Sequence, residues 1–202
     1  MQKTNWMDRF IKAAACGFIL AALLSFTGFS GQCDALERSV LRLHVLADSD
    51  APEAQAVKLE VRDAVLEEVN IWLNEETNYD QAIAAVCTHL DRLETAANRV
   101  LKAKGMPYKA KAEICDAYFP TRTYENHKLP AGKYRTLRIS LGEAEGKNWW
   151  CVVFPSLCVS GAVDFPELPE DAREAVAEAD RMQVRFMAVE IFNSLREFFD
   201  AR

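Results

Sequence analysis

The stretch Val40–Asp50, VLRLHVLADSD, decides the fold because one kind of element gives way to another within it. Its first part is a short apolar run rich in branched residues, which predicts a β-strand, and Asp48-Ser49-Asp50 is typical of a turn. Pro52 and Glu53 then suit the first turn of a helix. Apolar residues recur at helical spacing from there to about Leu73. We therefore predict a strand that leads directly into a helix.

The rest of the body continues with one more helix and then strands. A second helix is predicted from Asn78 to Gly105, which stops it. Residues 108–114 and 136–141 alternate with a period of two and predict half-exposed strands, whereas 149–154, WWCVVF, predicts a strand suited to the sheet centre. A last helix is predicted over 170–199.

The predicted order is therefore β-α-α-β-β-β-α. Three consecutive strands with short connections predict an antiparallel meander, with the first strand at either edge. Helices would cover one face of this mainly antiparallel sheet. The sequence thus predicts one α+β domain.

The N-terminal segment has the pattern of a targeting signal. Lys3, Arg9 and Lys12 stand against a single acid, Asp8, and no charged residue occurs over 13–33. A basic start followed by an apolar run is typical of an export signal, and its length approaches the ~20 residues that span a bilayer. We predict a signal peptide or an uncleaved signal anchor over 1–35 and an exported domain over 36–202.

The charge of the chain bears on the class of partner that it can bind. The chain has 24 basic and 30 acidic residues, a net charge of −6, and an acidic surface disfavours nucleic acid as a partner.

An exported body permits disulfides, and Cys87, Cys115, Cys151 and Cys158 allow three pairings. A Cys151–Cys158 disulfide is the better motivated pairing, because both lie on one segment with a bend at Pro155. Two reduced core cysteines are the alternative.

One polar cluster offers candidate chemistry. His44 and Asp48 share a face of the first strand but lie about 13 Å apart at ~3.3 Å per residue, and Asp50 could curl back at the strand end. These residues could act as acid–base groups or metal ligands. The favoured alternative is that the acids cap the turn and helix while His44 makes a buried hydrogen bond. We expect no catalytic set, metal or cofactor.

Two further features suggest a binding surface. Trp149 and Trp150 are adjacent on a strand and must point to opposite faces, so one should be core and the other covered by a helix or exposed. Arg122 and Tyr124 lie in a stretch rich in hydrogen-bonding groups, residues 121–127. That stretch is either a binding surface or an ordered surface turn, and both readings stay open.

Three segments together resemble one known family. They are Arg42–Asp50 with the helical stretch Lys58–Val65, then Phe119–Tyr124 with Leu129–Tyr134, and finally Gly146–Cys158. In this order they are similar to the stage II sporulation protein R family of endospore-forming Firmicutes, and the similarity runs from about Val40 to Phe199. The motif N-W-W-C…F-P-x-L-C of the third segment is the most specific part.

The resemblance implies a signalling protein and not an enzyme. Members of the family are made in the forespore and exported into the space between forespore and mother cell. There they trigger a membrane-embedded aspartic protease that removes the pro-sequence of sigma E. An exported hydrolase or metal-binding protein using His44, Asp48 and Asp50, and a non-catalytic envelope ligand-binding module, are the alternatives. The expected partner-binding residues are Arg122, Tyr124, Trp149, Trp150, His44 and Asp50.

Overall fold

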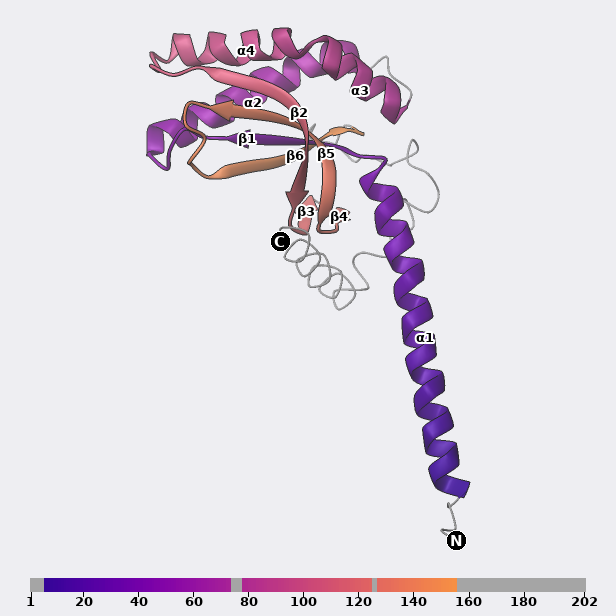
Figure 1. The fold of residues 1–202 in the computed structure, drawn as a ribbon. Coiled ribbons are helices and arrows are strands. Elements are labelled where there is room, and N and C mark those ends of the chain that lie inside the picture. The colour runs from indigo at the N-terminus through magenta and orange to yellow at the C-terminus, as the bar shows by residue number, and fades with distance from the viewer. Residues whose placement is uncertain (1–5, 74–77, 125–126, 156–202) are drawn as a thin grey trace.

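A computed structural model describes residues 6–73, 78–124 and 127–155. Its elements are α1 (Trp6–Glu37), β1 (Leu41–Leu46), α2 (Pro52–Leu73), α3 (Tyr79–Thr88), α4 (Leu90–Ala103), β2 (Ala110–Phe119), β3 (Arg122–Tyr124), β4 (His127–Leu129), β5 (Gly132–Leu141) and β6 (Asn148–Phe154). Figure 1 shows α1 as a rod leaving a body in which α2 and α4 lie over a sheet. The mixed α+β class is confirmed. The last helix predicted over 170–199 lies outside the described residues.

The order of strands in the sheet differs from the predicted meander. The order is β2-β5-β1-β6, with β1 parallel to β5 and antiparallel to β6, and β2 antiparallel to β5. The first strand therefore lies inside the described sheet, and β6, predicted for the centre, lies at its edge. The loop after β5 crosses the end of β1, where the Gly146 amide donates to the Ala47 carbonyl at 2.9 Å. This crossing leaves room for β1 between β5 and β6.

The helix-covered face of the sheet holds the main core. The inward residues of β1 and β5 are buried there against the apolar stripes of α2 and α4. The predicted periodicity is confirmed on both kinds of element, because these core residues include Leu41, Leu43, Val45, Val57, Val61, Val65, Leu93, Leu101, Leu137, Ile139 and Leu141. The parallel β1–β5 pairing requires a long crossover, which α2, α3, α4 and β2 supply.

The second predicted helix is two helices. Its start is as expected, with the Asn78 side chain accepting from the Gln81 amide at 3.0 Å, and Gly105 ends it with φ +69°. It breaks at His89, whose ring stacks on Trp72 of α2 at 4.8 Å between centroids. The break lets α3 and α4 take separate directions over α2, a tertiary effect that helical periodicity does not report.

The end of α1 belongs to the folded body. Cys33, Leu36 and Val40 are buried in or beside a second, smaller core on the other face of the sheet. Among the residues whose placement the structure describes, no helix is both long and apolar enough to cross a membrane. The signal or anchor thus stays a prediction.

Candidate functional site

The second face of the sheet carries the candidate site. Side chains alternate along β1, so Arg42 and His44 point away from the helix-covered core. Aromatic rings from four other strands gather around them. We call this set the aromatic face, and it consists of Arg42, His44, Phe119, Tyr124, Tyr134 and Trp150.

Arg42 is the centre of the aromatic face. Its side chain is 0% exposed, its Nη2 donates to the Tyr124 hydroxyl at 2.7 Å, and its Nε donates to the Cys151 carbonyl at 3.2 Å. The guanidinium carbon lies 4.1 Å from the ring centroid of Phe119 and 4.8 Å from that of Tyr134. The ring faces of Phe119 and Tyr134 thus stabilise a cation that is removed from water.

The charge on Arg42 has no acidic counterpart nearby. Among the described residues, no carboxylate forms an ion pair with it, and its Nη1 is buried without a hydrogen-bond partner. Burial lowers the pKa of Arg42, the two tyrosines oppose that change, and Arg122 adds to it. Burial in turn raises the pKa of Tyr124, so its hydroxyl stays protonated.

His44 lies beside Arg42 along β1 and is held by two contacts. Its ring stacks on Trp150 with centroids 3.9 Å apart and planes 17° apart, and its Nε2 lies 3.0 Å from the Asn148 amide oxygen. Burial lowers the pKa of His44, and Arg138 lowers it further against the effect of Asn148. The imidazole is therefore neutral at pH 7. The predicted buried hydrogen bond of His44 is confirmed.

Asp48 and Asp50 do not join His44. Asp48 accepts from the Glu143 amide at 3.0 Å and Asp50 accepts from the Lys147 amide at 2.8 Å. Both carboxylates therefore fix the loop between β5 and β6 on the end of β1. Within the described ranges, no three His, Cys, Asp or Glu side chains gather as metal ligands would.

The two tryptophans lie on opposite faces of β6, as predicted. Trp149 packs on the helix-covered core with the Arg62 guanidinium 4.3 Å above its ring, whereas Trp150 packs on the second core. Both are half-buried, so neither is the exposed anchor that the sequence left open. The aromatic face therefore includes Tyr124, Trp150 and His44 from the predicted set. It leaves out Arg122, Trp149 and Asp50.

The predicted binding stretch 121–127 is largely a β-hairpin. β3 pairs with β4 in the register Arg122↔Leu129, Thr123↔Lys128 and Tyr124↔His127. Figure 1 shows this hairpin at the end of the sheet away from α4. The Arg42–Tyr124 hydrogen bond ties the hairpin to β1, while Arg122 is exposed to solvent.

Sequence reasoning missed several residues of this site. Arg42, Phe119, Tyr134 and Asn148 were not singled out as candidates. One feature of the sequence did point to Arg42, because it is a cation within a strongly apolar strand. A cation that is buried with such a strand must find polar or aromatic partners. The partners come from strands far away in sequence, so spacing alone could not name them.

The cysteines divide into two groups. Cys151 is disulfide-bonded and so is not a free thiol nucleophile, and its predicted partner, Cys158, lies outside the described residues. Cys16, Cys33, Cys87 and Cys115 are free. Burial raises the pKa of Cys33 to about 12, with Glu37 and Asp34 adding to the effect. A thiol protonated so strongly is unreactive.

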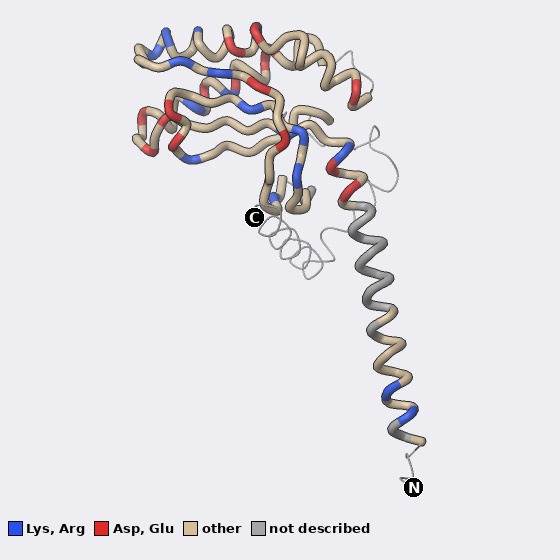
Figure 2. Tube along the Cα trace, in the orientation of Figure 1, with Lys and Arg blue, Asp and Glu red and all other residues tan. Residues whose placement is uncertain are grey.

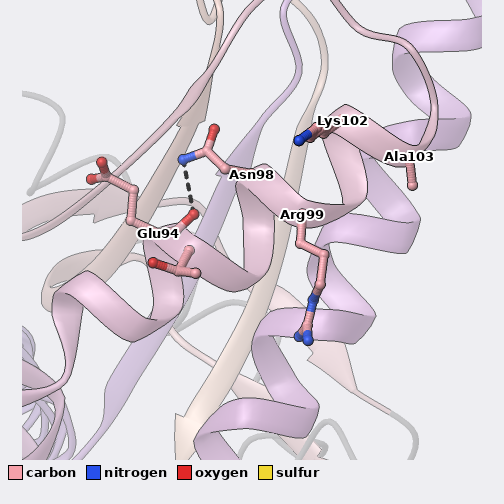
Figure 3. A pocket seen from close by; sticks show the side chains of 6 residues that line it. Glu94, Asn98, Arg99, Lys102 and Ala103 are labelled. Carbon is pink, nitrogen blue, oxygen red and sulfur yellow. Dashed lines mark hydrogen bonds between the residues drawn. The ribbon is translucent and has the colours of Figure 1, made fainter.

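A separate open hollow of about 640 Å³ lies on the outer side of α4. Figure 3 shows Glu94, Asn98, Arg99 and Lys102 around it, and its described lining contains no cysteine, serine or histidine. Asn98 and Glu94 already bind the backbone of β2, at Ala110 and at residue 112. The hollow is therefore a by-product of how α4 covers the edge of β2.

Comparison with known proteins agrees with the resemblance seen in the sequence. The family model described as stage II sporulation protein R matches residues 37–164. Stage II sporulation protein R of Bacillus subtilis (strain 168) is 35% identical over 118 residues, which are 58% of this chain and 53% of that relative. The chain thus spans about half of the relative's length, and no solved structure matches. The chain belongs to the stage II sporulation protein R family.

Proposed function

We propose that this protein is an exported signal that activates a membrane-embedded aspartic protease and so starts the processing of pro-sigma E in the mother cell. Membership of the stage II sporulation protein R family, over residues 37–164, carries this proposal. The basic start and the uncharged stretch 13–33 support export from the forespore. The same segment would hold the protein in the forespore membrane if it is not cleaved.

The chemistry of the candidate site supports binding over catalysis. His44 is neutral, stacked and hydrogen-bonded, Cys151 is disulfide-bonded, and the guanidinium of Arg42 is enclosed by rings. These groups stabilise one another and hold a surface in place. A hydrolase or metal protein that used His44 with Asp48 and Asp50 would need the three together, and the two acids instead bind loop amides.

The β3–β4 hairpin is the proposed contact surface for the protease. Arg122 is exposed on it, and Tyr124 fixes its position through the buried Arg42. Binding can shift the protease toward its active arrangement only if this surface has a higher affinity for that arrangement. A surface held on a rigid support meets that need, because less conformational entropy is lost on binding.

The test is processing in the endospore-forming host. The gene is deleted, and pro-sigma E is followed by immunoblot during sporulation, with complementation by the full chain, by Arg122→Ala and by a copy that begins at Cys33. The truncation keeps Cys33 because that residue is buried in the body. We expect the full chain to restore processing and the other two copies to fail.

A matched control is Lys109→Ala, because Lys109 is also exposed but precedes β2 at the far end of that strand. It should restore processing fully. Normal processing with Arg122→Ala would exclude the hairpin as the contact, and maturation of sigma E without the gene would contradict the function itself and favour an envelope ligand-binding module.

A further inference from the structure

We infer that the hairpin end of the sheet binds an acidic peptide segment of the partner protein. The site is the basic end, which we define as the buried Arg42 and the exposed Arg38, Arg122 and Lys133 at the same end of the sheet. The inference rests on the proposed function for the identity of the partner, and on the structure alone for the chemistry of the contact.

Backbone pairing brings the basic end together. Lys133 follows Gly132, which pairs with Phe119 at the end of β2. Thr121, next to Arg122, accepts through its hydroxyl from the residue-131 amide at 3.1 Å. A side chain added at Gly132 would overlap the carboxylate of Glu37, so the residues just after α1 lie at the same place.

Among the described residues, the cations of the basic end form no ion pair, whereas many other cations of the body do. Elsewhere on the body, acidic partners hold Arg62, Arg92, Lys104, Lys111, Arg135 and Arg138. In the part of the chain that the structure describes, no ion pair involves Arg38, Arg122 or Lys133. Figure 2 shows basic residues on β3, near the start of β5 and just after α1, with acidic residues in the last turns of α1.

Counted over the residues that the structure describes, the charge balance at this end is positive, on a chain whose net charge is −6. Two described acids, Asp34 and Glu37, stand against the four cations of the basic end. Arg42 contributes strongly because it is buried and has no carboxylate partner among the described residues, and its charge and that of Arg122 repel each other. An anionic group placed on the hairpin would relieve this repulsion.

A peptide fits this surface better than a membrane does. Recognition of anionic lipid usually needs a cluster of about four to eight exposed Lys or Arg residues, each contributing about 1 kcal/mol. The basic end exposes three. It also displays the Thr123 side chain and the short strand β3, groups that suit directional hydrogen bonds with a peptide carboxylate or backbone.

The test measures binding of a short fluorescein-labelled Glu-Ser repeat peptide to the purified full chain in neutral detergent, by fluorescence anisotropy. The test variant is Arg122→Glu with Lys133→Glu. The matched control is Arg99→Glu with Lys102→Glu, two exposed cations of α4 that likewise form no ion pair among described residues. All four sites are on the surface, so thermal unfolding should be unchanged in both variants.

We expect the test variant to lose roughly tenfold or more in affinity and the control less than about twofold, with binding of the unmodified chain weakened by added salt. Equal losses in both variants, or no loss in the test variant, would overturn the inference. Hydrogen exchange at the hairpin gives a further test. If the hairpin becomes protected only when phosphatidylglycerol is added to the micelles, the ligand is a surface of lipid headgroups, and the inference is overturned.

Processing assays separate this inference from the proposed function. If the test variant loses peptide binding yet still supports pro-sigma E processing, acidic recognition stands and the hairpin is not the activating contact. If the variant binds the peptide normally but fails in processing, the activating role stands and the acidic peptide is refuted.

Discussion

Removal of a single hydroxyl, in Tyr124→Phe, tests how the hairpin is held on the sheet. The Tyr124 oxygen accepts from Arg42 Nη2 at 2.7 Å, and the guanidinium is 0% exposed. The Arg42 Nη1 already lacks a hydrogen-bond partner among the described residues, so the variant would leave a second buried nitrogen unsatisfied. A hydrogen bond to a charged group contributes about 1.5–3 kcal/mol. We therefore expect the free energy of unfolding to fall by about 2 kcal/mol.

The assay is urea unfolding of the full chain followed by tryptophan fluorescence, with hydrogen exchange read separately at the hairpin and at β1. A loss of about 2 kcal/mol should lower the melting temperature by about 4–8 °C in a chain of this size. Exchange should rise in 122–124 and 129 before it rises in β1, because Arg42 retains its bond to the Cys151 carbonyl. The slope of unfolding against urea should not change.

Tyr108→Phe is the matched control. The Tyr108 hydroxyl is buried, has no hydrogen-bond partner in the described part of the chain, and belongs to the helix-covered core. Its removal should change the free energy of unfolding by less than about 0.5 kcal/mol. Equal stability of the two variants, with equal exchange at the hairpin, would refute the role given to Arg42 and Tyr124.

Two other perturbations have signed outcomes. Because burial lowers the pKa of His44 below its ordinary 6.5, the unfolded chain takes up a proton on this residue before the folded one does. The contribution of His44 to the free energy of unfolding should therefore be constant above about pH 6.5 and should fall as the pH drops below it. Urea titrations at several pH values should show this fall reduced in His44→Gln, and an unchanged fall in that variant would contradict the assignment. Gly146→Ala should lower the free energy of unfolding by about 1–3 kcal/mol in thermal unfolding, because the new methyl group would overlap the Ser49 carbonyl, a backbone atom that cannot turn aside. In Gly105→Ala nothing lies within 4 Å of the added carbon, so only the positive φ should lower the free energy of unfolding, by about 1 kcal/mol. An equal loss of stability in the two variants would contradict a close approach at Gly146.

Local elements of the fold were predictable from the sequence because their signals are local. The helix α2 begins at Pro52 and ends at Leu73, as periodicity and the N-terminal proline indicate. The inward residues of β2 and β5 also follow directly from alternation. These features depend on a residue and its neighbours within one or two turns, so a single sequence contains them.

The strand order was not predictable in the same way. β1 and β6 are both apolar runs, and hydrophobicity alone does not decide which of them takes the centre. The deciding contacts are between distant segments, such as the close approach of Gly146 to Ser49 and the bond from Gly146 to Ala47. Neither contact has a signature in the residues themselves.

The candidate site shows the same division. His44 and Tyr124 were chosen for their chemistry, and the structure places both on the aromatic face. Arg42, which joins them, looks in the sequence like an ordinary alternating cation. Its importance comes from burial and from rings on three other strands, which only the assembled sheet brings together.

The most direct test of the proposed signalling role is the fate of pro-sigma E in sporulating cells that lack this gene. The blot compares the deletion strain with strains that carry the full chain or the copy beginning at Cys33. Our account predicts that the precursor persists in the deletion strain and matures only with the exportable full chain. Normal maturation in the deletion strain, or equal rescue by the copy without the export segment, would contradict it.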